Sequence, residues 1–341
     1  MRIAASGAVT GTPIDTLTDA EREFLDRMAA ADGAAEISGG LLAIAGGEDR
    51  SHDAQTASSM WRVYADDQNP AASTSPADDP TPANDSSPSD SPATPTELIG
   101  FGIRALQGER HAAEFLIAPD HRGQGLGETL LSTILDEEPE AWCWAHGDSP
   151  AARHLADKHG LSRDRVLFQM RTDDGLTLSD LPQVSVPEGV RLRSFAPGDE
   201  AGWLRVNNAA FDWHPEQGSQ TLADIEAIVG AADFDPDSVI LAVRDGEIIG
   251  FHETKLTDGP GGRLGEVYVV GVDPAIHAKG VGRALTLEGM RRMVTAGATA
   301  IELYVESDNG PALGLYERLG FHVAVAHVSY APASSTQSTQ E

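Results

Sequence analysis

One stretch of this chain occurs twice, and the repetition limits the possible folds more than any other feature. The copies cover residues 113–135 and 265–285, and each runs from a strand-like apolar segment through a glycine turn into a helical pattern. In each copy a proline lies six residues before the first glycine of a G-x-G, which is Gly125 in the first and Gly280 in the second. A self-similar pattern of this kind indicates an internal duplication.

The similarity continues downstream at a constant offset. Shifted by 160 residues, AARHLADKHGL at 151–161 aligns with PALGLYERLGF at 311–321. We expect two domains, at 1–181 and 188–331, since 341 residues suffice for two domains of ordinary size. The proline-bounded segment 182–187 is the predicted joint.

The second copy has the chemistry of an anion site. The β-branched run 267–272 predicts a strand, the turn Lys279-Gly280-Val281-Gly282 follows, and a helix is predicted to open at Arg283. Glycines let backbone N–H groups approach a ligand, and the unpaired donors of a first helical turn attract phosphate. An ordinary tight turn between a strand and a helix is the alternative for this stretch alone.

The remaining periodicity predicts alternating strands and helices. A helix is expected over 15–30, capped by Thr16 or Thr18, and short strands over 41–45, 61–64 and 98–105. In the second half we expect strands at 190–195, 239–243, 248–252, 300–305 and 323–330, and helices at 199–211, 222–229 and 309–319.

Residues 66–96 differ in kind from the rest of the chain. Their 31 residues hold seven prolines and six aspartates and no aromatic or large aliphatic side chain. Such a segment cannot bury enough apolar surface to offset the entropy of ordering it, so we expect a disordered insertion within the first domain. A disordered tail is expected at 332–341.

Composition excludes several classes of partner. A net charge of −29 argues against nucleic acid and anionic membranes. The one cysteine, Cys143, rules out an intramolecular disulfide and is predicted to be a packed strand residue, and the histidines lack metal-site spacing, so no metal is expected. Without a long apolar run or a leader-like N-terminus, the sequence predicts a cytoplasmic protein.

Two motifs in order carry a family resemblance. R-x-x-G-x-G, as Arg122-Gly-Gln-Gly-Leu-Gly127, follows a strand in the first half, and N-x-x-A-x-x-x-Y-E-x-x-G-F runs from Asn309 to Phe321 in the second. With the order β-α-α-β-β-β-α-β-α-β, the chain resembles the GNAT family of acyl-CoA N-acyltransferases in both halves. The second half departs from the first motif at His277, where the family has a basic residue. The resemblance implies an α/β fold with a mixed sheet in two tandem GNAT domains.

The resemblance implies that acetyl-CoA is bound along both repeats. In the second half the implied contacts are Val270, Gly271, Val272, His277, Ala278, Lys279, Gly280, Val281, Gly282, Arg283, Asn309, Gly310, Pro311, Ala312, Leu313 and Gly314. In the first half they are Phe115, Leu116, Ile117, Gly123, Gln124, Gly125, Leu126, Gly127 and Glu128.

The resemblance also implies roles for four acidic or aromatic residues. Glu266 is the base that takes a proton from the attacking amine, and Tyr316 is the acid that protonates the departing thiolate. Glu216, Lys255, Glu266 and Tyr304 are implied to contact the acceptor. Each has a plainer structural reading: a solvated strand-edge carboxylate for Glu266, a packed ring for Tyr316 or Tyr304, a helix cap for Glu216 and a surface lysine for Lys255.

The first half lacks the implied acid. Ala156 stands where Tyr316 stands, and Ser149 replaces Asn309, so this half is predicted to bind acetyl-CoA without catalysing. Such enzymes also use a glutamate near the first helix, with which Glu36 does not align.

Three functions remain open from the sequence. The leading one is acetyl transfer to a small-molecule thiol precursor by a monomeric enzyme. The alternatives are acetyl transfer to another amine, such as a peptide N-terminus or an aminoglycoside, and a non-catalytic acetyl-CoA-binding module.

Overall fold

The protein packs as two compact units that do not follow the order of the chain. The computed structural model describes residues 2–7, 17–32, 37–38, 41, 59–65, 97–107, 110–212, 218–259, 261–276 and 279–332. The first unit holds the described residues of Met1–Trp144, Ala151–Ser162 and Ala331–Glu341, and the second holds those of Ala145–Pro150 and Arg163–Tyr330. Residues 163–181, which precede the expected joint, therefore pack in the second unit. The boundary between the two repeats along the chain stays a prediction.

The first unit is a sheet with helices from the first repeat. Its strands lie in the order β1-β2-β3-β4-β5, antiparallel up to β4, with β5 parallel to β4. Phe24 and Met60 lie in its buried apolar core. The elements are β1 (Arg2–Gly7), α1 (Asp19–Asp32), β2 (Ser59–Tyr64), β3 (Leu98–Gln107), β4 (Arg110–Ile117), η1 (Pro119–His121), α4 (Leu126–Glu137), β5 (Trp142–Ala145) and α5 (Pro150–Lys158).

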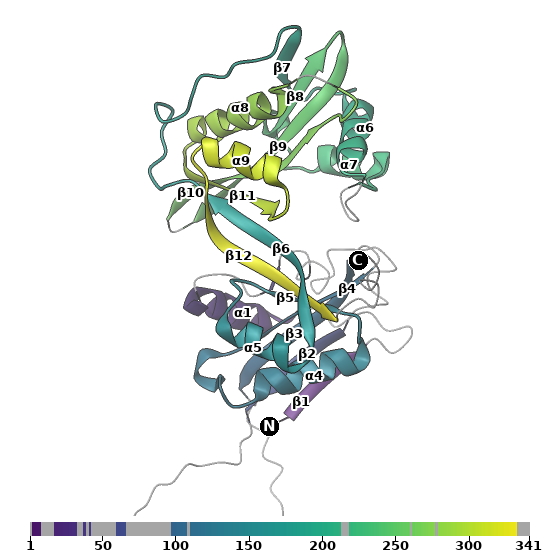
Figure 1. Ribbon diagram of the computed structural model, residues 1–341, viewed down its shortest axis with the longest axis vertical. Helices are drawn as coiled ribbons and strands as arrows, with labels where there is room; N and C mark the ends of the chain where they lie inside the picture. The colour runs from purple at the N-terminus through teal and green to yellow at the C-terminus, as the bar shows by residue number, and fades with distance from the viewer. Residues whose placement is uncertain are drawn as a thin grey trace, which may run out of the picture. The chain divides into compact units, whose positions relative to one another are not determined.

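The second unit is a mixed sheet covered on both faces. Over this unit the strand order is β12-β6-β11-β10-β9-β8-β7. Helices α6 and α7 lie on one side of the sheet, and α8 and α9 lie on the other (Figure 1). The elements are β6 (Leu161–Arg171), β7 (Val190–Ser194), α6 (Glu200–Ala210), α7 (Leu222–Gly230), η2 (Pro236–Ser238), β8 (Val239–Arg244), β9 (Glu247–Gly259), β10 (Gly262–Val272), α8 (Val281–Thr295), β11 (Ala298–Glu306), α9 (Gly310–Arg318) and β12 (His322–Pro332).

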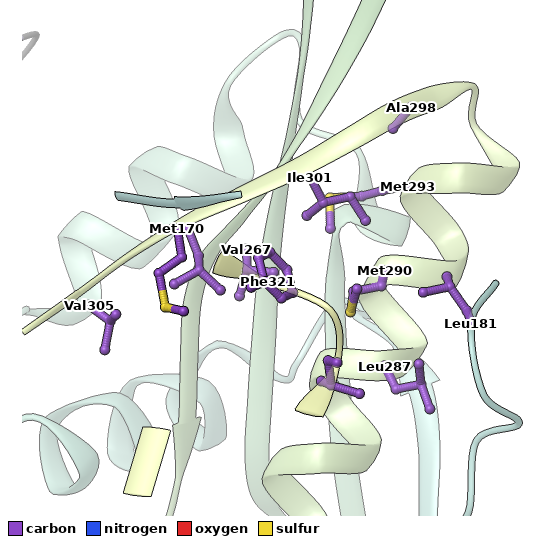
Figure 2. Close-up of a cluster of buried hydrophobic side chains, with 12 residues drawn as sticks. Met170, Leu181, Val267, Leu287, Met290, Met293, Ala298, Ile301, Val305 and Phe321 are labelled. Carbon is purple, nitrogen blue, oxygen red and sulfur yellow. The ribbon is translucent and has the colours of Figure 1, made fainter. Parts of the chain in front are cut away.

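An apolar layer fixes α8 against the sheet. Val267 of β10 and Ile301 of β11 pack on Met290 and Met293 of α8, and these side chains point into one layer (Figure 2). Because side chains alternate across a strand, the neighbours of Val267 along β10 lie on the opposite face. The layer therefore decides which residues of β10 and β11 face away from α8.

The α/β fold predicted from the repeat is confirmed. Helices α5 and α9 begin 160 residues apart and α4 and α8 begin 155 apart, which matches the two offsets between the repeats. Of the two caps offered for the first helix, Thr18 is the one used, because its hydroxyl accepts from the Glu21 N–H while the Glu21 carboxylate accepts from the Thr18 N–H.

Some expectations differ from the structure or lie outside its described residues. Strand β6 was not predicted, and β9 runs seven residues beyond the expected 248–252. A strand was expected at 41–45, but the backbone of Leu41 is helical, and 42–45 are not described. Pro332, expected in the tail, belongs to β12. The insertion at 66–96 and residues 333–341 lie outside the described residues.

Candidate active site

The strands β10 and β11 pair over only part of their length. Their parallel register covers Arg263 to Val267, after which β10 continues to Val272 without a partner on that side. A bulge opposite β9 at Tyr268 changes the course of β10 where the pairing ends. The unpaired edge of β10 beyond Val267 thus offers backbone N–H and C=O groups to an extended ligand.

The glycine turn at the end of this edge is built for an anion. Gly280 is the N-cap of α8 with φ of 93°, and no side chain caps the helix, so the first-turn N–H groups stay available. The residues before the turn are fixed by Asp273, whose carboxylate pairs with Arg205 at 2.6 Å and accepts from the Ala275 N–H. Among the described residues, Lys279 forms no ion pair, and nor does Arg283.

The structure brings most of the expected acetyl-CoA residues to one end of the second sheet. Val270 to Val272 form the free edge of β10, and Lys279 to Arg283 follow at the start of α8. Residues Asn309 to Gly314 start α9, where the Asn309 side chain accepts from the Ala312 N–H at 3.3 Å and so acts as the cap. His277 and Ala278 lie outside the described residues.

Glu266 stands on the face of β10 that points away from α8. Burial raises its pKa, Lys255 opposite it on β9 lowers it, and the charge of Glu302 raises it again. The net effect is a pKa above the ordinary value. A carboxylate with a raised pKa is a stronger proton acceptor, which suits a general base.

Lys255 lies in the same polar region as Glu266. Its Nζ sits 3.0 Å from the centre of the Tyr268 ring, a cation–π contact. Both residues line a groove of about 1210 Å³, which Glu253 and Arg292 also line. Lys255 is therefore placed at the mouth of a cavity rather than on an open surface.

The two tyrosines take different positions. Tyr304 is 45% exposed on β11, so the structure excludes core packing as its role. Tyr316 on α9 is half-buried beside Phe321, with ring centroids 5.8 Å apart, and burial raises its pKa to about 12. A phenol with that pKa keeps its proton at neutral pH, as a donor to a leaving thiolate requires.

Other expected residues fall into place or outside the description. Glu216 and Glu36 are not among the described residues. Cys143 is buried as predicted, and burial raises its pKa to about 12, so it is no nucleophile. In the described part of the chain no three His, Cys, Asp or Glu side chains are grouped to hold a metal, and no described helix is long and apolar enough to cross a membrane.

The first repeat keeps the glycine turn in a different electrostatic setting. Gly125 caps α4 with φ of 82°, and β4 pairs with β5 through only two residues, so the same free edge is present. Arg122, however, is bound to Asp32 of α1 by two contacts of 2.9 and 2.5 Å. Glu128 in the first turn pairs with Lys158 at 2.6 Å.

The remaining first-repeat residues surround that turn. Phe115 to Ile117 end β4, and Gly123 to Glu128 form the turn and the start of α4. Ala156 is buried at the position of Tyr316. Glu114, at the position of Glu266, is buried and accepts from the Ser38 N–H. No tyrosine acid is present at that position, and the matching carboxylate is engaged by the backbone.

Sequence reasoning missed three polar residues of the second unit. Glu302 lies beside Glu266 across the β10–β11 register, Gln169 of β6 donates to Glu302, and Glu253 lines the groove. Strand alternation places Glu302 on the face of Tyr304, a signal that was available. Its neighbour on β10 depends on a register that no local pattern gives.

Comparison with known proteins agrees with this geometry. The profile of the acetyltransferase (GNAT) family matches residues 60–161 and 203–321, one match in each repeat. The chain belongs to the GNAT family. It is an N-acetyltransferase with two tandem GNAT regions, and the family uses acetyl-CoA.

Several curated relatives share one name. The mycothiol acetyltransferase of Streptomyces bingchenggensis is 49% identical over 216 residues, which are 62% of this chain and 70% of the relative. That of Streptomyces coelicolor is 48% identical over 231 residues, covering 66% and 73%. That of Saccharomonospora viridis is 42% identical over 248 residues, covering 70% and 80%.

Solved structures agree on the fold. A GCN5-related N-acetyltransferase from Sphaerobacter thermophilus aligns with a TM-score of 0.63 at 21% identity, over 96% of this chain and 94% of its own. A tandem GNAT protein from the clavulanic acid biosynthesis pathway aligns with a TM-score of 0.62 at 15% identity, over 96% and 97%. At these identities the likeness bears on the fold alone.

Proposed function

We propose that this chain transfers the acetyl group of acetyl-CoA to the free cysteinyl amine of desacetylmycothiol, the inositol-linked cysteinylglucosamine that becomes mycothiol. The support is twofold: relatives at 42–49% identity are named mycothiol acetyltransferase, and the second unit sets Glu266 beside the free edge of β10. That juxtaposition of a proton acceptor with an open strand edge is the observation that carries the reaction type.

The donor is proposed to lie along β10 and α8. Its pyrophosphate would meet the N–H groups from Lys279 to Gly282, and its pantetheine arm would pair with the backbone of Val270 to Val272. A backbone N–H at that edge would polarise the thioester carbonyl. Lys279 and Arg283 add positive charge close to the phosphates.

The reaction proposed is direct transfer without an acyl-enzyme. Glu266 takes a proton from the ammonium group, directly or through a water, and the neutral amine forms a C–N bond with the thioester carbon. The C–S bond then breaks, and Tyr316 gives its proton to the departing thiolate. Lys255, Tyr304 and the loop that holds Glu216 are the proposed contacts to the rest of the acceptor.

The first repeat is proposed to bind acetyl-CoA without transferring its acetyl group. The glycine turn at Gly125 and the edge after Ala113 supply the same backbone groups as the second repeat. Calorimetric titration of the protein with acetyl-CoA then gives two sites. A stoichiometry of one would remove the first site. The enzyme is expected to work as a monomer, which sedimentation tests directly.

Incubation of the purified protein with acetyl-CoA and desacetylmycothiol tests the function. We expect free CoA and N-acetylated product in equal amounts, both quantified by chromatography and mass spectrometry. Parallel reactions contain a peptide with a free N-terminus or an aminoglycoside at the same concentration. A higher kcat/KM for either of these amines, or no CoA release with desacetylmycothiol, would overturn the proposed acceptor.

A further inference from the structure

Glu302 of β11 lies directly beside Glu266 of β10. The parallel register sets the two residues opposite one another, and neighbouring strands lie about 4.8 Å apart. Val267 and Leu303, which follow them, are both buried in the layer against α8. Strand alternation therefore turns both carboxylates to the same, opposite face.

The charges around this pair do not balance. Lys255 is the cation opposite Glu266 on β9, while Glu253 on β9 and Tyr304 on β11 add no positive charge. Glu302 makes no ion pair in the part of the chain that the structure describes. Within the face formed by β9, β10 and β11, three carboxylates thus share one lysine.

Arg171 and Gln169 of β6 explain why Glu302 keeps its charge. Arg171 lies opposite Glu302 in the register but pairs with Asp174 at 2.7 Å. Gln169 donates from Nε2 to Oε2 of Glu302 at 2.8 Å. An amide donor fixes the position of a carboxylate without neutralising it.

We propose that Glu302 and Glu266 form one anionic pair that captures the acceptor as an ammonium ion, with Gln169 holding Glu302 in place. The inference rests on the proposed function of the same site. It adds a reason for acceptor choice, because a cationic amine gains from both carboxylates whereas a neutral hydroxyl does not.

Glu302 also acts through Glu266 on the proton transfer. When the ammonium binds, one proton passes from nitrogen to the Glu266 carboxylate, and the nitrogen lone pair becomes free to attack the thioester carbon. The neighbouring charge of Glu302 favours the protonated form of Glu266, so it strengthens Glu266 as an acceptor. The two groups titrate as a coupled pair, with Glu302 staying ionised through its amide donor.

A titration without any acceptor tests the electrostatic part. Carboxyl-labelled glutamate in the full-length protein is followed by carbon NMR, and the Glu266 signal is assigned by its loss in Glu266→Gln. We expect the Glu266 midpoint to move to lower pH in Glu302→Gln. The matched control is Glu247→Gln, which removes one exposed charge from the far end of β9 and should leave the midpoint in place. An unchanged midpoint in Glu302→Gln, or an equal shift in the control, would overturn the proposal.

Steady-state kinetics test the capture of the amine. In Glu302→Gln we expect KM for the amine to rise about tenfold, the loss of one charge-assisted contact, while KM for acetyl-CoA stays constant. The acid limb of kcat/KM should move to lower pH. Gln169→Leu should also raise KM for the amine, and Gln169→Glu should not restore it.

The two proposals fail in different ways. Wild-type protein that transfers no acetyl group to desacetylmycothiol refutes the proposed function, and the amine it does use then serves for the kinetic comparison. Wild-type protein that is active, with the amine KM and acid limb of Glu302→Gln unchanged, refutes the role of Glu302 alone.

Discussion

Replacing Tyr316 by Phe removes the proposed proton donor and leaves its ring in place. The ring packs edge-on against Phe321 at an interplanar angle of 65°, and no side-chain hydrogen bond of the described residues involves its hydroxyl. The variant should therefore fold as the wild type does, with a Tm within about 1 °C.

The rate effect follows from the chemistry of the leaving group. With a pKa of about 12, Tyr316 is protonated in all but roughly one molecule in 10⁴ at pH 8. General acids contribute about 10²- to 10⁴-fold. A thiol has a pKa near 8.5, so a thiolate departs with little help, and the lower end applies. We expect acetyl transfer to slow about 100-fold, which corresponds to about 2.7 kcal/mol in the barrier.

Single-turnover kinetics measure this step directly. Excess enzyme is mixed with acetyl-CoA and desacetylmycothiol, and CoA is quantified by chromatography, because product release can mask chemistry in kcat. The acetyl-CoA Kd should be unchanged, and the wild-type rate should show no basic limb from Tyr316 below about pH 10. A single-turnover rate within threefold of wild type would refute the acid role.

Three further variants test the base, the glycine turn and the packing of α8. Glu266→Gln should lower kcat/KM at least about 100-fold; because the folded pKa of Glu266 is raised, its stabilising contribution is complete at low pH and lost as pH rises through that pKa, so urea unfolding should find the variant more stable than wild type at pH 7.5 but not at pH 4. Gly280→Ala forces a side chain into φ of 93°, costing about 1–2 kcal/mol, and calorimetry should show acetyl-CoA binding about tenfold weaker to the second repeat; unchanged affinity would contradict the anion site. Gly289→Ala sets a Cβ 2.1 Å from the fully buried His252 ring, and after about 1 kcal/mol of gained helix propensity we expect a net loss of about 2 kcal/mol in urea unfolding. The matched control is Gly230→Ala, with no atom within 4 Å of its Cβ, which should stay within about 0.5 kcal/mol of wild type.

Local patterns were enough for most elements of the second unit. The Asp245-Gly246 turn between β8 and β9 has positive φ at both residues, 54° and 90°, as the sequence pair indicates. The glycine turn likewise ends in a left-handed cap at Gly280. These features depend on a few adjacent residues, so the sequence contains the whole cause.

Long-range pairing could not be read in the same way. The end of the β10–β11 register at Val267 and the pairing of β6 with β11 depend on strands far apart in the chain, and propensity does not choose partners. Glu302 was missed for this reason. The opposite case is Tyr304, where an apolar-looking alternation allowed a core position and only the fold shows the ring to be exposed.

The pairing of β6 with β11 also bears on how such a chain can change during evolution. Residues of β6 precede the expected joint at 182–187, yet they form ladder pairs with Glu302 to Glu306. A gene fragment that starts after the joint would encode the second repeat but leave β11 with an open edge, prone to pair with other chains. It would also lack Gln169. The inactive first copy cannot be shed, because the duplicated genetic segment and the folding segment have different borders.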